Sequence, residues 1–159
     1  MVFIAPSHVV GGSHYGVKME RLEIKIGGEN MDITLIHDYL SNRSYWAKKI
    51  PLKMVKFSLQ NSFCVGMFAN DQQIAFARLI TDYATFAYLA DVFVIDEWQQ
   101  QGIGKLLLQH LTELDWVKNL RRFMLATRDA HGLYKQFGFT ELSHPERLME
   151  ITRPAIYER

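Results

Sequence analysis

The order of elements between residues 90 and 117 constrains the fold more than any other part of the sequence. Residues 90–95 form a short, mostly apolar run rich in β-branched and aromatic side chains, which is typical of a strand buried on both faces. After a polar turn, apolar residues recur at spacings of three and four and predict one helix that begins near Gly102. They are Ile103, Leu106, Leu107, Leu111, Leu114 and Val117. We therefore expect a strand, a glycine turn and a helix.

The turn from Gln99 to Gly104 predicts an anion site. Successive backbone N–H groups lie at the start of a helix, where unpaired donors and the helix dipole favour negative charge, and the glycines allow close approach to the main chain. Two better-known phosphate motifs do not match. A Walker A loop would have glycine in place of Gln99, and a dinucleotide fingerprint would have a third glycine in place of Leu107.

Two motifs resemble the GNAT superfamily of acetyl-CoA-dependent N-acetyltransferases. The superfamily's loop, Gln/Arg-x-x-Gly-x-Gly/Ala, is matched by Gln99, Gly102 and Gly104. Residues 127–139 resemble its final helix and the Tyr-x-x-x-Gly-Phe ending, with Tyr134 in the tyrosine position. The motifs occur in the expected order, on a strand-helix-strand-helix-strand background. The resemblance covers about residues 60–142 well and the preceding region loosely.

Length and composition are those of a single globular domain. The chain has 159 residues and a formal charge of +1, so no large field favours nucleic acid or an anionic membrane as a partner. Its single cysteine, Cys64, lies among apolar residues and is read as a buried small hydrophobe. It also fits a reducing compartment, and we expect a cytoplasmic protein. The six histidines show no metal-ligand spacing, so we expect no metal site.

The remaining segments predict an arm and one domain. Residues 1–20 have neither the basic start nor the apolar core of a signal peptide and read as an N-terminal arm. The arm is either a dispensable extension or a segment that packs on a partner subunit in a homodimer. The single domain would span residues 21–159. Its predicted strands are 22–26, 62–68, 73–81 and 85–95, and its early helices are 31–40 and 51–59, separated by a loop over 41–49. Asn30 or Asp32 would cap the first helix.

With the resemblance, these elements predict an α/β (α+β) fold. We expect a mixed, mainly antiparallel and twisted sheet of six or seven strands, with helices on both faces. A V-shaped opening is expected beside the strand that ends at Ile95.

The resemblance implies acetyl-CoA as co-substrate. The main chain of the strand before the turn, near Phe93 and Val94, would pair with the pantetheine arm. The turn would hold the pyrophosphate, and Lys105 is either a charged contact or a solvated helix residue. The full predicted set is Phe93, Val94, Gln99, Gln100, Gln101, Gly102, Ile103, Gly104, Lys105, Thr127, Ala130 and Tyr134.

Acyl transfer to an amine requires a proton for the departing thiolate and a route for the amine proton. Tyr134 is the candidate for protonating the thiolate, with a core tyrosine as the alternative. Asp91 and Asp82 are the candidate bases, although Asp82 is as readily a turn residue and Asp91 a strand-edge residue. Attack would be direct, without an acyl-enzyme.

The acceptor is the least constrained part of the prediction. Tyr45 and Trp46 follow the first helix, a region that borders the acceptor site in this superfamily, and an aromatic wall there suits a cationic or aromatic amine. Trp46 could equally plug the loop onto the core. We expect N-acetylation of a small-molecule primary amine. The alternatives are a protein or peptide N-acetyltransferase and a non-catalytic acyl-CoA-binding sensor module.

Overall fold

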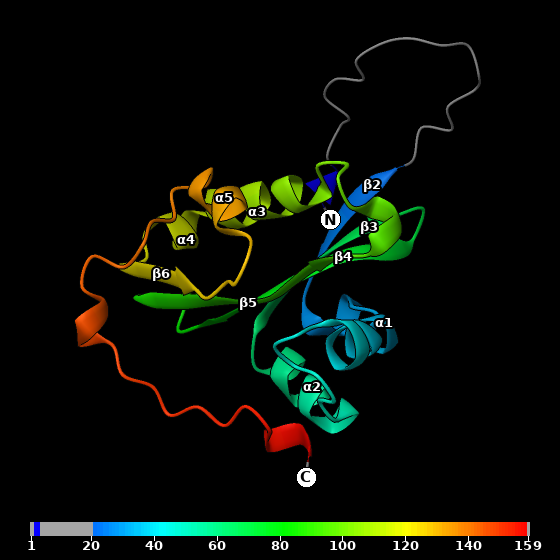
Figure 1. Ribbon diagram of the computed structural model, residues 1–159. Helices are drawn as coiled ribbons and strands as arrows, with labels where there is room; N and C mark the ends of the chain where they lie inside the picture. The colour runs from blue at the N-terminus through cyan, green and yellow to red at the C-terminus, as the bar shows by residue number, and fades with distance from the viewer. Residues whose placement is uncertain (1, 4–20, 159) are drawn as a thin grey trace.

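A six-stranded, mainly antiparallel sheet organises the chain (Figure 1). The computed structural model describes residues 2–3 and 21–158. The strands lie in sequence order, and only the last neighbouring pair is parallel. They are β1 (Val2–Phe3), β2 (Leu22–Ile26), β3 (Phe63–Ala69), β4 (Gln72–Thr81), β5 (Phe86–Val94) and β6 (Arg122–Leu125). Five of them have four to ten residues and β1 has two. The predicted fold class is confirmed.

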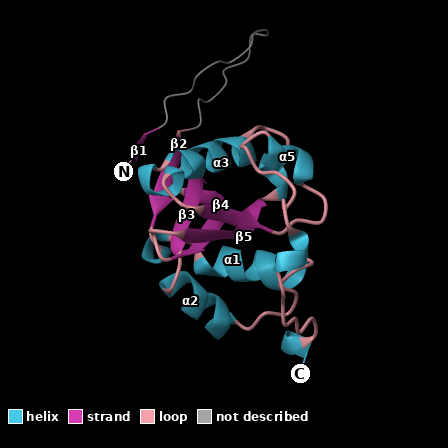
Figure 2. Ribbon diagram, turned by 90° about the vertical axis from the view of Figure 1, so that its left-hand side faces the viewer, coloured by secondary structure: helices cyan, strands magenta, loops and turns pink. Residues whose placement is uncertain are grey.

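Helices cover both faces of this sheet, as Figures 1 and 2 show. One face carries α1 (Ile33–Asp38) and α2 (Leu52–Gln60). The other carries α3 (Ile103–Glu113), α4 (Asp115–Lys118) and α5 (His131–Lys135). Short helical turns are η1 (Gly28–Asn30), η2 (Tyr39–Arg43), η3 (Asp96–Trp98), η4 (Pro145–Arg147) and η5 (Ile156–Glu158). No helix in residues 2–3 and 21–158 is long and apolar enough to cross a membrane.

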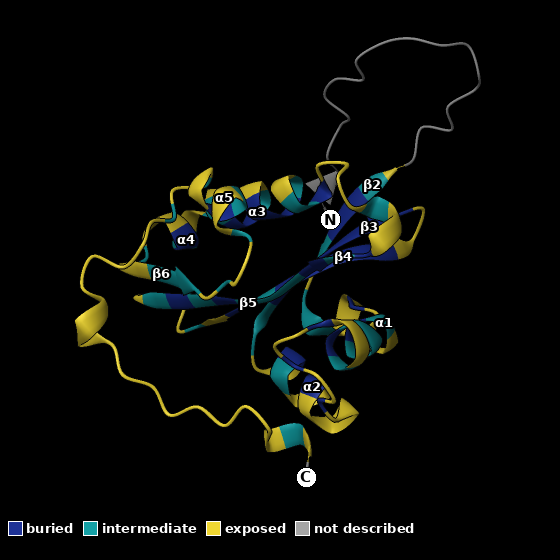
Figure 3. Cartoon of the chain, in the orientation of Figure 1, coloured by how far each residue is buried: buried dark blue, intermediate teal, exposed yellow. Residues whose placement is uncertain are grey.

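The core lies on the two faces of the central strands, where Figure 3 shows the buried residues. Six consecutive residues of β3 are buried, because helices cover both of its faces. The amphipathic helix α3 buries Ile103, Leu107 and Leu111 of the predicted face, and also Leu108, which was not predicted, while Leu106 is only partly buried. On the opposite face, α2 buries Val55 and Leu59. The central strands are therefore packed on both faces.

The first helix differs from the prediction at its end. It begins where expected, with the Asp32 carboxylate accepting from the N–H groups of Thr34 and Leu35, each at 3.0 Å. The predicted loop over 41–49 is wrong at its start, because a π-helical turn continues from Tyr39 to Arg43. The Ser44 hydroxyl donates to the Leu40 carbonyl at 2.6 Å and closes this turn. Such π turns have no simple sequence signal.

The third helix is shorter than predicted. It ends at Glu113, because Leu114 is extended at φ −60° and ψ 129°, and α4 then begins at Asp115. The Thr112 hydroxyl donates to the Leu108 carbonyl at 3.0 Å, a contact that bends helices. Val117 is still buried, so the predicted apolar face is retained across the break.

No strand follows α5 among the described residues, which corrects the strand expected after the final helix. Gly138, at φ +87°, ends the helix, and the Phe139 N–H donates to the Tyr134 carbonyl. Further along, Pro145 lacks a donor and opens the turn η4, which interrupts any extended run. The predicted arm, residues 1–20, lies outside the described residues except for Val2–Phe3, which pair with Ile24 and Glu23.

Candidate functional site

The parallel strands β5 and β6, the last two of the sheet, pair over only part of their length and leave an opening beyond Leu89. Their register runs from Phe86 opposite Arg122 to Leu89 opposite Leu125, where β6 ends. β5 continues for five residues to Val94, paired on this stretch only with β4. One edge of residues 90–94 is thus free to pair with an extended ligand. The prediction of burial on both faces is wrong here, because Ala90, Asp91, Val92 and Val94 are only partly buried.

A β-bulge deforms β5 at this opening. Ala90 lies opposite Arg78, whereas Phe93 lies opposite Phe76, so β5 contains one residue more than β4. Asp91 has φ +54°, an uncommon conformation for a residue other than glycine. Bulges increase the local twist and re-aim the strand edge, often beside active sites. The bulge therefore turns the main chain around Val92 and Phe93 out of the regular ladder.

Two neighbours hold the bulged residue in place. The Asp91 carboxylate accepts from Arg78 Nε at 2.5 Å and from Trp46 Nε1 at 2.9 Å. The Arg78 guanidinium also donates to the Ser62 hydroxyl at 3.0 Å. Only 15% of the Arg78 side chain and 9% of the Asp91 side chain are exposed. These contacts occupy both oxygens of Asp91, which suits a structural carboxylate better than a free base.

The turn between β5 and α3 presents a row of unpaired donors. The N–H groups from Gln100 to Lys105 make no hydrogen bond within residues 2–3 and 21–158, and helical bonding begins with Leu106 N–H donating to Gly102 O at 3.1 Å. Gln100 and Gly102 have φ +60° and +83°, which directs the chain into this conformation. A Cβ at Gly102 would meet no atom within 4 Å, so the space before it is open. Such a row fits a phosphate group.

Glutamine side chains fix the shape of this turn. Gln99 Nε2 donates to the Val94 carbonyl at 3.0 Å, and Gln101 Nε2 donates to the Glu97 carbonyl at 2.8 Å. The predicted phosphate turn is therefore anchored to the end of β5. Lys105 is exposed, and its two predicted roles both stay open.

Tyr134 extends from α5 and is 9% exposed. Burial, followed by the nearby Tyr45 and Asp129, raises the pKa of Tyr134 to about 12. Its hydroxyl makes no hydrogen bond to any described residue. The phenol is thus protonated at neutral pH and has its proton free to donate. Just before the helix, the Thr127 hydroxyl accepts from the Ala130 N–H at 3.1 Å and shapes the approach to α5.

Tyr45 and Trp46 bridge the two sides of the opening. Trp46 donates to Asp91 on β5, while the Tyr45 hydroxyl accepts from the Arg128 N–H at 3.1 Å. The Arg128 guanidinium lies over the Tyr45 ring at 3.9 Å, and the two aromatic rings meet edge-on at 5.0 Å. Both rings are more than two-fifths exposed. The structure thus brings Tyr45, Trp46 and Asp91 to the same end of the opening as Tyr134.

Asp82, the other candidate base, lies elsewhere. It is at the tip of the β4–β5 hairpin, before Phe86, at the end of β5 opposite to the glycine turn. Its carboxylate accepts from the Thr85 hydroxyl at 2.7 Å and from the N–H groups of Thr85, Ala84 and Phe86. These bonds, the Thr85 hydroxyl first, lower the pKa of Asp82 well below its usual range. The structure favours the turn-residue interpretation.

Sequence reasoning missed two arginines of this site. Arg78 stands in the otherwise apolar strand β4, and a charge in a buried strand signals a buried partner, so it could have been found. Arg128 gave no such signal, because its contact with Tyr45 joins residues 83 apart in the sequence. Another aromatic pair supports the site from the α1 side, where Tyr39 stacks on Phe93 at 4.0 Å.

Comparisons with known proteins agree with this geometry. The family model of the acetyltransferase (GNAT) domain matches residues 60–141. A Gibberella zeae protein named as a putative acetyltransferase is 32% identical over 121 residues. The match covers 64% of this chain and 68% of that protein. A crystal structure from Xanthomonas campestris, assigned to GNAT acetyltransferases, is 45% identical with a TM-score of 0.84, covering 87% of this chain and 98% of that one.

A more distant structure shares the fold. A Clostridium acetobutylicum protein, named as a predicted acetyltransferase and solved with acetyl-CoA, is 15% identical, with a TM-score of 0.64 over 82% of this chain and 96% of that one. The family model covers more than half of the chain, and the chain belongs to the GNAT acetyltransferase family.

In residues 2–3 and 21–158, no group of three or more His, Cys, Asp or Glu side chains is placed to hold a metal ion.

Proposed function

We propose that this protein transfers the acetyl group of acetyl-CoA to a primary amine of a small molecule by direct attack. One observation carries the proposal. A free strand edge, residues 90–94, is followed directly by the row of unpaired N–H groups from Gln100 to Lys105. An amide chain ending in a pyrophosphate would need these two features in this order.

The residues present fit this co-substrate. The N–H row and the open space before Gly102 would receive the pyrophosphate, with Lys105 close enough in sequence to add charge. The free edge at Phe93 and Val94 would pair with the pantetheine amides. When bound, the thioester supplies an activated acetyl carbonyl. Thr127 and Ala130 lie just before α5, the helix that carries Tyr134.

The chemistry needs few groups from the protein. The amine nitrogen forms a bond to the carbonyl carbon, the C–S bond breaks, the amine loses a proton and the thiolate gains one. Backbone N–H groups at the bulge near Phe93 would stabilise the oxyanion, because a bulge leaves ladder donors free. Tyr134 would donate a hydrogen bond to the departing thiolate, since its phenol is protonated and has no competing acceptor among the described residues, and the thiolate would take its proton from solvent.

The amine proton is best assigned to water. Asp91 is engaged by Arg78 and Trp46, and Asp82 is engaged by its own turn at the other end of β5. Neither carboxylate has a free oxygen directed at the opening. We therefore propose that the amine binds in its neutral form, or loses its proton to solvent, and that activity rises with pH as the amine deprotonates.

Tyr45 and Trp46 would form the acceptor wall. Their exposed rings face the opening from the loop after η2, and ring faces favour apolar or cationic groups. Because Arg128 already covers one face of Tyr45, the Trp46 ring is the better candidate for contact with the acceptor.

The test is a panel of amines incubated with acetyl-CoA, with products identified by mass and free thiol release measured in parallel. Acetylation of small aromatic or aliphatic amines, reduced in Trp46→Ala, supports the proposal. Acetylation of peptides alone would make the protein a peptide N-acetyltransferase. Binding of acetyl-CoA without any product over the whole panel would instead favour a sensor module.

A further inference from the structure

Arg128 is a basic residue beside the opening whose main chain and side chain both contact Tyr45. The Arg128 N–H donates to the Tyr45 hydroxyl at 3.1 Å. The guanidinium carbon lies 3.9 Å from the centroid of the Tyr45 ring. An arginine stacked on an aromatic face is already restricted in orientation, so it loses less freedom when it binds a further group. Arg128 is thus oriented for a ligand, although its side chain is 66% exposed.

Stacking leaves the hydrogen-bond donors of Arg128 available. The N–H groups of a guanidinium lie in its plane and point outward from its edge, whereas the contact with Tyr45 uses its face. Among the described residues, the one carboxylate that pairs with Arg128 is Asp129, whose Oδ2 lies 3.6 Å from Nη2. Both side chains are 66% exposed, and exposed pairs of this kind are weak. A carboxylate of a ligand can therefore bind the edge of the guanidinium.

Arg128 lies near Tyr134, the residue proposed to contact the departing thiolate. After burial, the neighbours that raise the pKa of Tyr134 are Tyr45 and Asp129. Tyr45 carries the stacked guanidinium, and Asp129 pairs with it. An acceptor whose anionic group binds Arg128 can thus place its amine at the same end of the opening as Tyr134.

The loop that carries the acceptor wall adds positive charge. Lys48 and Lys49 follow Trp46 by two and three residues, and both are exposed. Neither forms an ion pair within residues 2–3 and 21–158. The Asp91 carboxylate, to which Trp46 donates, is already paired with Arg78 and does not offset this charge. The surroundings of the acceptor wall therefore attract an anion and disfavour an acceptor whose only charge is positive.

We propose that the acceptor amine carries a carboxylate and that Arg128 binds it. The planar fork of a guanidinium matches the two oxygens of a carboxylate, so the contact orients the acceptor as well as holding it. The exposed Trp46 ring contacts the apolar part of the same molecule. The inference rests on the proposed function and gives its substrate class, which is amino acids and related amino carboxylates. Arg128 determines specificity and takes no part in bond making.

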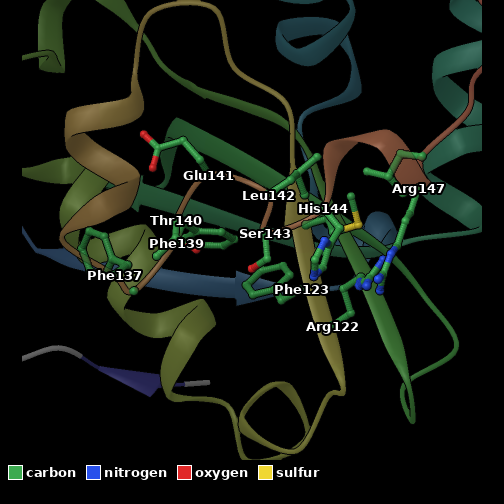
Figure 4. Close-up of a pocket in the computed structure, with 13 residues that line it drawn as sticks. Arg122, Phe123, Phe137, Phe139, Thr140, Glu141, Leu142, Ser143, His144 and Arg147 are labelled. Atoms are coloured by element: carbon green, nitrogen blue, oxygen red, sulfur yellow. The ribbon is translucent and has the colours of Figure 1, made fainter.

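Another arginine of the structure provides a matched control. Figure 4 shows Arg122, His144 and Arg147 along a cavity of about 390 Å³ beside β6. Arg122 lies opposite Phe86 at the start of β6, whereas the opening lies beyond the other end of this strand, at Leu125. Arg122 is exposed like Arg128, so its replacement removes an equal charge away from the acceptor end.

The first test measures kcat and KM for acceptors that differ only in the carboxylate. The pairs are phenylalanine with phenethylamine, and β-alanine with ethylamine. The wild type should prefer the carboxylate-bearing member of each pair. Arg128→Met keeps an unbranched side chain beside Tyr45 and should raise KM for that member by about 10- to 100-fold, with little change in kcat or in the values for the other member. Arg128→Lys should recover part of the loss, and Arg122→Met should equal the wild type.

The second test separates failure of this inference from failure of the proposed function, because it needs no turnover. Calorimetry compares N-acetylphenylalanine with N-acetylphenethylamine in the wild type and in Arg128→Met. Tighter binding of N-acetylphenylalanine that is lost in Arg128→Met supports the carboxylate site, whether or not an amine is acetylated. Equal affinities for the two compounds, or a preference for amino carboxylates that persists in Arg128→Met, would overturn it even where acetylation proceeds.

Discussion

Replacing Tyr134 with phenylalanine removes the proposed hydrogen-bond donor to the thiolate and little else. The ring is 9% exposed and packs edge-on against Phe139 at 5.9 Å, contacts that phenylalanine keeps. The hydroxyl has no hydrogen-bond partner among the described residues, so no internal bond is lost. Tyr134→Phe should therefore retain the fold and bind acetyl-CoA with nearly the affinity of the wild type.

The size of the rate effect follows from the raised pKa. At about 12, the pKa of the Tyr134 phenol lies well above the reference value of about 8.5 for a thiol, so complete proton transfer to the thiolate is uphill. The phenol then acts by donating a hydrogen bond to a charged group, which contributes about 1.5–3 kcal/mol. This corresponds to a fall in kcat of about 10- to 150-fold, smaller than the upper range of general-acid catalysis.

The assay compares kcat with the Kd for acetyl-CoA in Tyr134→Phe and in Tyr83→Phe. Tyr83 lies at the distant hairpin tip and is 53% exposed, so its variant should behave as the wild type. A wild-type kcat in Tyr134→Phe would show that the phenol does not stabilise the departing thiolate. Loss of acetyl-CoA binding would show instead that the hydroxyl has a structural role.

Three further predictions concern the turn, the bulge and alkaline pH. Gly102→Val should weaken acetyl-CoA binding more than tenfold in calorimetry, because φ +83° strains a side chain and the Cβ would enter the open space; unchanged affinity would remove the assignment of the turn. Arg78→Met leaves Asp91 charged without its main partner and should lower the free energy of unfolding in urea by about 3 kcal/mol, whereas a loss below about 1 kcal/mol would mean that the pair is weakly coupled. Burial raises the pKa of Cys64 to about 11 and that of Tyr134 to about 12, so the folded state favours their neutral forms. The contribution of these two groups to the free energy of unfolding should be complete below about pH 9 and fall as the pH rises toward 12. In thermal melts, Tyr134→Phe should reduce the fall above about pH 10. Equal melting temperatures at about pH 8 and about pH 11 would contradict this prediction.

Patterns that repeat along the chain predicted most of the fold. The spacing of the α3 leucines depends on one buried face, so local sequence was sufficient there. In β2 the strand is present, but the alternation does not match the burial, because Glu23 is buried and Ile26 is 39% exposed. The break at Leu114 and the π turn after Asp38 were not predictable in this way, because both depend on side chains bonding to nearby carbonyls. The prediction of a strand after α5 was wrong, because no strand follows α5 in the described residues.

The candidate site likewise has parts that short motifs predicted and parts that depend on long-range contacts. The glycine turn and the place of Tyr134 could be read from short motifs, because close approach to a phosphate demands glycine at fixed positions. The bulge at Asp91 could not, since it arises from a register shift against β4 and is held by Trp46 from another element. This long-range contact also decides that Asp91 is a poor candidate base, a choice that sequence alone left open.

The central claim is that the free edge of β5 and the turn after it together bind acetyl-CoA. Amide hydrogen exchange with and without acetyl-CoA tests it most directly, because both segments have backbone N–H groups that a bound ligand would protect. We predict slower exchange in residues 91–94 and 100–105 on addition of acetyl-CoA, with no change in residues 148–152. Protection that spares both the strand edge and the turn would contradict the account.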